Sequence, residues 1–263
     1  MVFRVFSRLN SCPPAVPLPP PPPTLESRLA VRQPSARAHV MHQRWEHLLF
    51  LHWCWDAAEI QRTLPPGLYV DTFQGDAWVA IVPFYMRGIR PRFTPSVPWI
   101  SNFLELNVRT YVHDAQGRPG VWFYSLDCNQ PLAVWTARTF FHLPYQHARM
   151  TATTSNGWTD YHCQRQGHAD EARYRYHLAP ECNAAQTDAI EFFLAERYLL
   201  FSNTPRGIRC GQVHHTPYPL ASAKLESWSI APLLQAGLTD PRRAPDHIIG
   251  SPGVDVRVYP LTA

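Results

Sequence analysis

Polar side chains suited to binding or transforming a small molecule alternate along one short segment, residues 103–112. Glu105, Asn107, Arg109 and Tyr111 share one face of a predicted strand, because strand side chains alternate with period two. A carboxylate can carry a proton, and a guanidinium can hold an organic anion. The residues between them are Leu106, Val108 and Thr110, so the opposite face is largely apolar. This pattern is typical of a wet outer surface or of a cavity wall, and the flanking segments favour the cavity.

Each of these residues also has a purely structural explanation. Glu105 and Arg109 lie on the same face and could neutralise each other as an ion pair. Tyr145, in the segment LPYQ, could be a buried aromatic with a satisfied hydroxyl. In the functional interpretation Glu105 is catalytic, as a proton carrier. Arg109, Asn107 and Tyr111 then bind the substrate.

Strands dominate the elements that must position this segment. We expect strands at about 45–55, 68–73, 76–85, 103–114, 121–126, 147–154, 158–166, 171–178, 198–201, 208–215 and 225–230. Helices are expected at 57–64 and 132–141 and around 190–194. Many strands and few short helices predict a mainly β (α+β) fold with largely antiparallel strands.

The chain divides by composition into three parts. Residues 13–23 read PPAVPLPPPPP, a polyproline segment that cannot enter a helix or a sheet interior. Residues 1–40 are therefore expected to be a disordered tail: a docking peptide, a transit peptide, or the result of a start codon assigned upstream of Met41. Residues 41–235 are expected to form the β domain. Residues 236–263 contain Pro, Gly and Arg and are expected to form a loosely packed tail.

Charge and cysteine content limit the function classes. The net charge of +4 arises in residues 1–40, and the rest of the 263-residue chain carries equal numbers of basic and acidic groups, so nucleic-acid binding is not expected. No apolar run reaches the roughly 20 residues of a membrane span, and no membrane association is expected. Six cysteines without a C-x-x-C motif or a secretory signal fit reduced thiols and a cytoplasmic location.

Known cofactor and metal motifs are missing from the sequence. His47 and His52 would point to opposite faces of one strand, and the adjacent His214 and His215 likewise face apart. Nucleotide fingerprints and the G-x-S-x-G nucleophile motif are also absent. We therefore expect no cofactor and no metal.

Several sequence segments together resemble a known bacterial family of unknown function, the YqjF-like family. They include LPPGLYVDTFQGDAWVAIVPF at 64–84, ELNVRTYV at 105–112, GVWFYSLD at 120–127 and LPYQHARM at 143–150. The family is placed in the acetoacetate-decarboxylase-like superfamily. The resemblance implies a cone-like antiparallel β-barrel, wrapped by further sheet, with a cavity inside.

The same resemblance bears on the chemistry. Acetoacetate decarboxylases use a Schiff-base lysine beside a cavity glutamate. The resemblance places the glutamate at Glu105 and the lysine at Tyr145, which implies that Tyr145 is a second catalytic residue, as a hydrogen-bond donor. The superfamily's arginine near the first strand has no clean counterpart, because the register places Glu46 there, with Arg44 close by. Lys224 is the only lysine in the chain. Decarboxylation through a Schiff base is therefore not expected.

Three functional hypotheses follow, and the sequence leaves open whether the protein is an enzyme. The first is acid/base chemistry on a small organic acid or carbonyl compound. The second is a non-catalytic binding protein for a hydrophobic or aromatic metabolite, with a cavity lined by residues such as Trp53, Phe84, Trp122 and Trp135. The third is a structural partner of another chain, which needs an exposed apolar patch for which the sequence contains no strong signal. A small molecule is the expected partner, and a homo-oligomer stays an alternative.

Overall fold

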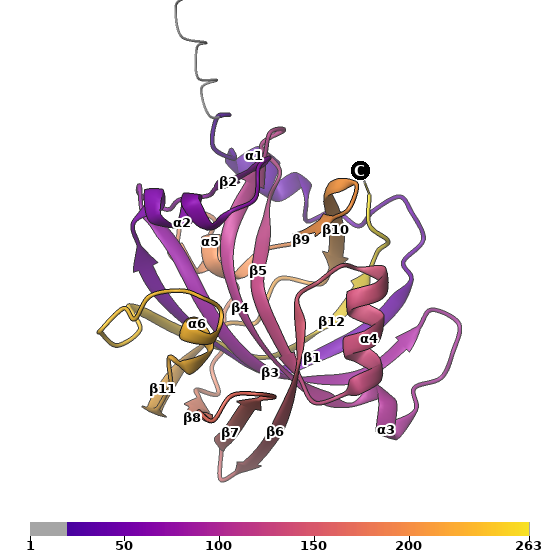
Figure 1. Ribbon diagram of the computed structural model, residues 1–263, viewed down its shortest axis with the longest axis vertical. Helices are drawn as coiled ribbons and strands as arrows, with labels where there is room; N and C mark the ends of the chain where they lie inside the picture. The colour runs from indigo at the N-terminus through magenta and orange to yellow at the C-terminus, as the bar shows by residue number, and fades with distance from the viewer. Residues whose placement is uncertain (1–19, 263) are drawn as a thin grey trace, which may run out of the picture.

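A computed structural model describes residues 20–262, in which twelve strands form one continuous sheet (Figure 1). The sheet order is β10-β9-β5-β6-β7-β8-β11-β12-β1-β3-β4-β2. The strands are β1 (Met41–Trp55), β2 (Leu68–Val70), β3 (Ala77–Pro91), β4 (Phe103–Asp114), β5 (Pro119–Cys128), β6 (Tyr145–Ser155), β7 (Trp158–Arg165), β8 (Ala172–Leu178), β9 (Leu199–Thr204), β10 (Gly207–His214), β11 (Ala221–Ser227) and β12 (His247–Val258). The expected mainly β fold with few short helices is confirmed.

Six short helices accompany the sheet in the described part of the chain. They are α1 (Leu25–Ala30), α2 (Ala57–Thr63), α3 (Pro98–Ser101), α4 (Pro131–Phe140), α5 (Ile190–Ala195) and α6 (Ala231–Gln235). Helix α4 begins where the Gln130 side chain accepts a hydrogen bond from Leu132 N, and Pro144 follows shortly after its end. None of these helices is long and apolar enough to cross a bilayer.

Part of the sheet curls into a ring of strands. Strands β12, β1, β3, β4, β5, β9 and β10 pair in succession, and β10 returns to β12. The β5–β9 and β10–β12 contacts hold only two residue pairs each, so the ring is partial. Gly120 permits the β5–β9 contact, since a Cβ there would lie 2.7 Å from Leu199 O.

Strand β4 is buried along its whole length because both of its faces meet apolar layers. Its Phe103 and Tyr111 belong to a core cluster inside the ring, together with Phe84. Its Leu106 and Val108 belong to a second cluster on the other side. The alternation of β4 therefore separates an inner face, which carries the polar residues, from an apolar outer face.

The expected loosely packed C-terminal tail is wrong. Strand β12 lies between β1 and β11 and pairs with β1 from Met41↔Val258 to His52↔His247. Its alternating Val254, Val256 and Val258 are buried. This period-two signal is short and follows a stretch rich in Pro and Arg, whose composition suggested a loop.

The expectation of a disordered tail over residues 1–40 is wrong for its described part. Thr24 caps the N-terminus of helix α1, because its hydroxyl oxygen accepts a hydrogen bond from Ser27 N. Arg28 of this helix forms two hydrogen bonds with Asp71, and the Gln212 side chain donates to Val31 O. Residues 1–19, including most of the polyproline run, lie outside the described residues.

Candidate functional site

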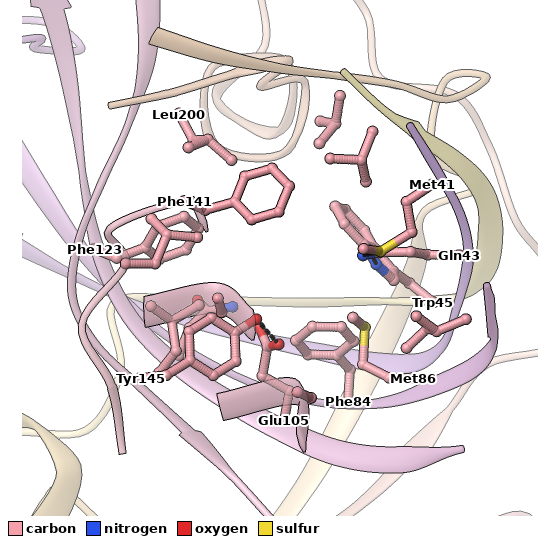
Figure 2. A pocket seen from close by; sticks show the side chains of 18 of the residues that line it. Met41, Gln43, Trp45, Phe84, Met86, Glu105, Phe123, Phe141, Tyr145 and Leu200 are labelled. Carbon is pink, nitrogen blue, oxygen red and sulfur yellow. Dashed lines mark hydrogen bonds between the residues drawn. The ribbon is translucent and has the colours of Figure 1, made fainter. Parts of the chain in front are cut away.

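A cavity of about 280 Å³ lies inside the ring, between the inner faces of β1, β3, β4 and β5 and the inner side of α4 (Figure 2). Most of its lining is apolar, including Leu48, Val82, Phe84, Leu126 and Phe141. Three lining residues are exposed, Pro91, Ile100 and Leu132. The cavity therefore opens to solvent near α3 and the start of α4.

Glu105, Asn107, Arg109 and Tyr145 all line this cavity. The three residues of β4 are no more than 8% exposed, so they lie on a cavity wall and not on a wet outer surface. The side chains of Glu105 and Tyr145 point toward each other in Figure 2, where the Tyr145 hydroxyl donates a hydrogen bond of 2.5 Å to a Glu105 carboxylate oxygen. The two elements that carry them, β4 and β6, are thus joined at the cavity wall.

Glu105 has an unusual affinity for protons. Burial raises the pKa of its carboxyl to about 7, although hydrogen bonds from Tyr145 and Asn107 act in the opposite direction. Burial also holds the pKa of the Tyr145 hydroxyl well above its usual range, so this group stays protonated. Near neutral pH Glu105 can therefore either accept or donate a proton, whereas Tyr145 serves as a donor of hydrogen bonds.

The backbone around Glu105 is also fixed. The hydroxyl of Tyr161, on β7, donates to Glu105 O at 2.7 Å, and the residue pairs with Cys128 on β5. A carboxyl held in this way loses little further freedom when a ligand binds.

Arg109 has no carboxylate partner within ion-pair distance among residues 20–262, so the alternative explanation by an ion pair with Glu105 is wrong. One Nη2 contact reaches Leu194 O at 3.4 Å, and its buried Nε has no hydrogen-bond partner in the described structure. The guanidinium lies over the rings of Phe50 and Tyr111, at 5.4 and 5.7 Å from their centroids. A buried guanidinium with free donors is suited to an anionic group of a ligand.

A second cavity arginine, Arg197, escaped the sequence analysis. Its Nη1 pairs with Asp71 at 2.6 Å and its Nε donates to Phe193 O. Burial lowers its pKa to about 10, although Asp71 acts to raise it. Arg197 follows α5 in an irregular segment without alternation. Asp71 could have pointed to Arg197, because a carboxylate that is buried in a core needs a cationic partner.

Tyr111 does not line the cavity, although the sequence analysis placed it in the binding set. Its hydroxyl lies 2.9 Å from His52 Nε2, and the ring of Phe193 covers it at 5.5 Å. Arg109 and Arg197 both lie over its ring. Tyr111 therefore packs against the guanidinium groups of Arg109 and Arg197 and does not face the cavity. Asn107 does line the cavity, and its buried Oδ1 has no partner among the described residues.

The cavity has an aromatic lining of the kind expected for a carrier, but it comes largely from residues other than those named, including Trp45, Phe103, Phe123, Phe141 and Tyr218. Phe84 lines the cavity, but Trp53, Trp122 and Trp135 do not. Trp53 is fully buried in the second core cluster, and Trp135 is 57% exposed on α4.

Lys224 lies on β11, is exposed and does not line the cavity; its Nζ lies 5.7 Å from the ring of Trp158. Glu46, which the family resemblance aligned with an arginine, pairs with Arg44 and does not line the cavity. In the described chain no three His, Cys, Asp or Glu side chains are grouped to hold a metal ion. Glu105 is thus the one carboxyl group among the described residues that line the cavity.

Replacing Tyr145 by phenylalanine should raise the pKa of Glu105, by about one unit. The reason is that the hydroxyl stabilises the ionised carboxylate, and its loss leaves the desolvation of Glu105 less opposed. An NMR titration of the Glu105 side-chain carboxyl carbon measures the shift. Tyr124→Phe is the control, since that hydroxyl bonds Thr63 instead. An unchanged or lowered pKa in Tyr145→Phe would contradict this account.

Comparison of the sequence with known proteins identifies a family and a relative. Residues 42–255 match DUF2071, described as an uncharacterized conserved protein. The uncharacterized protein YqjF of Bacillus subtilis (strain 168) is 37% identical over 190 residues, which are 71% of this chain and 77% of that protein.

Solved structures share the fold at low sequence identity. Acetoacetate decarboxylase from Legionella pneumophila has a TM-score of 0.58 at 11% identity, covering 88% of this chain and 92% of its own. An acetoacetate decarboxylase-like enzyme from Sphingomonas wittichii RW1 has a TM-score of 0.56 at 13% identity, covering 86% and 93%. The enduracididine biosynthesis enzyme MppR, complexed with pyruvate, has a TM-score of 0.53 at 14% identity, covering 87% and 91%. At these identities the similarity establishes the fold alone.

Proposed function

Because this chain belongs to the DUF2071 family and has the acetoacetate-decarboxylase-like fold, we propose that its cavity binds an organic acid or carbonyl compound and exchanges protons with it. The observation that carries the proposal is the buried Glu105 carboxyl, whose pKa is about 7, in the same cavity as the unpaired guanidinium of Arg109. A proton carrier near neutrality and an anion-binding group are the two parts that acid/base chemistry on such a compound needs.

The proposed reaction is a proton shift within the ligand. Arg109 binds the anionic or carbonyl oxygen, and the Glu105 carboxylate takes a proton from a carbon next to a carbonyl. The electrons of that C–H bond move into the enolate, and Glu105 returns the proton at another position. Tyr145 stays protonated and holds Glu105 in place. The ligand is isomerised, and this step uses no lysine, oxidant or metal.

The shape of the cavity limits the ligand further. Its apolar lining favours a compound with an apolar body, whereas Arg109 and Asn107 provide unpaired polar groups that can fix one end. Pyruvate, found with the fold relative MppR, is both an acid and a carbonyl compound, which supports this chemical class.

A panel of 2-oxo and 3-oxo carboxylic acids, beginning with pyruvate and continuing to members with apolar substituents, tests the proposal by thermal stabilisation. We expect the acids to raise the melting temperature and their neutral esters to do so less. Arg109→Ala should weaken binding about tenfold to a hundredfold, because a charge-assisted hydrogen bond is lost. Arg206→Ala, in the exposed β9–β10 turn, is the matched control.

A non-catalytic binding protein for a hydrophobic metabolite is the second candidate, and the largely apolar lining favours it. Ligand proton exchange into D₂O separates the two candidates. Exchange that is lost in Glu105→Gln supports catalysis. Binding without exchange, or binding of neutral aromatics that is unaffected by Arg109→Ala, supports the carrier.

A further inference from the structure

Large apolar side chains gather on the surface at the mouth of the cavity, although the sequence contains no strong signal for an exposed apolar patch. We define the aromatic platform by its exposed residues: Phe93 (88%), Trp99 (88%), Ile100 (44%), Leu132 (47%), Trp135 (57%) and Phe140 (60%). They come from the loop before α3, from α3 and from α4. The Gln130 side chain joins these elements by donating to Trp99 O at 3.0 Å, and the rings of Trp135 and Phe140 lie 5.7 Å apart. An apolar surface of this kind marks an interaction site.

The platform is continuous with the cavity. Ile100 and Leu132 belong to both. The exposed Pro91 also lines the cavity, and it lies two residues before Phe93 of the platform. The polar residues Glu105 and Arg109 are buried deeper, at 3% and 8% exposure. A ligand that leaves the cavity therefore passes directly over the aromatic platform.

The charges around the platform have one sign. No aspartate or glutamate occurs in residues 77–104 or 128–159, the two segments that build it. Beside it lies a basic cluster of Arg90, Arg92 and Arg257: Arg90 and Arg257 flank His42 in the sheet, and Arg92 covers the ring of Phe93. His39 and His42 lie 2.9 Å apart, and burial and the nearby arginines lower the pKa of both, so the positive charge comes from the arginines.

The nearest acidic groups along the neighbouring strands are already paired. Glu46 and Asp255 both bind Arg44. The basic cluster thus keeps its positive charge and favours an anionic partner.

From this combination we propose that the aromatic platform docks on the surface of an anionic lipid bilayer. Trp and Phe side chains enter the interface between headgroups and acyl chains, while arginines beside them attract anionic headgroups. A second copy of this chain fits less well, because a two-fold contact through the platform would bring two basic clusters together. The contact is peripheral and needs no membrane-spanning segment.

Docking in this orientation would place the cavity mouth against the bilayer. An organic acid with an apolar tail could then pass between the lipid phase and the cavity without crossing water. This ligand class rests on the proposed function, whereas the docking itself does not. Arg109→Ala should therefore leave vesicle binding unchanged even if it abolishes ligand binding.

Co-sedimentation of the full chain with vesicles tests the docking. We expect binding to phosphatidylcholine vesicles containing phosphatidylglycerol, and much weaker binding to phosphatidylcholine alone. Trp99→Ala with Trp135→Ala should weaken binding about tenfold or more, because two aromatic side chains no longer enter the interface. Removing one basic group near an anionic surface should weaken binding about fivefold. Arg92→Glu should weaken it by more than this, because the new carboxylate is also repelled by the anionic headgroups.

Matched controls lie outside the aromatic platform. Trp228 follows β11, which lies with α6 opposite α3 and α4 (Figure 1), so Trp228→Ala should bind vesicles normally. Arg206→Glu changes the same charge as Arg92→Glu but in the exposed β9–β10 turn. Circular dichroism confirms that each variant is folded.

Two results would overturn the proposal. One is vesicle binding that is equal for neutral and anionic lipid, or equal in platform and control variants. The other is a dimer in sedimentation equilibrium that Trp99→Ala with Trp135→Ala converts to a monomer, without any vesicle binding by the native chain. The second result would assign the platform to a second copy.

Discussion

Replacing Asp71 by alanine is expected to lower the free energy of unfolding by about 3–5 kcal/mol, because it leaves the guanidinium of Arg197 buried without a counter-charge. The Asp71 side chain is fully buried and pairs with Arg197 at 2.6 Å and with Arg28 at 2.7 Å. Burial alone would raise the pKa of Asp71, but the two arginines lower it overall, so the carboxylate stays ionised. Urea unfolding at pH 7 measures the loss.

Two further variants make this prediction selective. Asp255→Ala removes a carboxylate that is 81% exposed and pairs with Arg44, and should cost no more than about 0.5 kcal/mol. Arg28→Ala should cost less than Asp71→Ala, since Arg197 still neutralises Asp71. Equal losses in Asp71→Ala and Asp255→Ala would show that the buried pair contributes nothing special.

This cluster matters for function because Arg197 lines the cavity. Asp71 follows β2, Arg197 follows α5, and Arg28 comes from α1, so three distant segments meet at one carboxylate. Loss of Asp71 should therefore also displace a cation from the cavity wall.

Local periodicity explains what could be predicted of the fold. The alternation in residues 103–114 located β4 with its observed bounds, and the apolar–polar pattern located β7 closely. Composition misled at both ends. Valines at alternate positions in β12 were outweighed by nearby Pro and Arg, and α1 is too short to produce a periodic pattern.

The site could be predicted only as far as one strand carries it. Glu105, Asn107 and Arg109 share the inner face of β4, so their common exposure to the cavity follows from period two. Tyr145 was found through the family resemblance, because nothing local relates β6 to β4. Tyr111 has the same parity but lies where Phe193 covers the strand, and this long-range contact leaves no trace in the sequence.

Replacing Glu105 by glutamine is expected to make the protein more stable above neutral pH, by roughly 3 kcal/mol. The pKa of Glu105 is about 7 in the folded protein and 4.5 as an ordinary glutamate, so the folded state binds the proton more tightly. Stability from this group is therefore greatest at low pH, falls as the pH rises from about 4.5 to 7, and stays reduced above. Glutamine is neutral throughout and can still accept the Tyr145 hydrogen bond.

Urea unfolding of both proteins at pH 5 and pH 8 measures this effect, and all other titrating groups cancel in the comparison. The variant should gain little at pH 5 and most at pH 8. Glu181→Gln, at an exposed position, should follow the native chain at both values. Curves that stay parallel for Glu105→Gln and the native chain would mean that Glu105 is ionised as an ordinary carboxylate.

The same variant separates a proton carrier from a structural residue, because the two roles predict changes of opposite sign in the free energy of unfolding. If Glu105 carries the proton, Glu105→Gln should slow ligand proton exchange about a hundredfold or more while leaving ligand affinity nearly unchanged. A residue retained for packing would instead lose stability when replaced. Higher stability at pH 8 together with lost exchange would identify a buried carboxylate whose ionisation costs folding free energy and enables the chemistry.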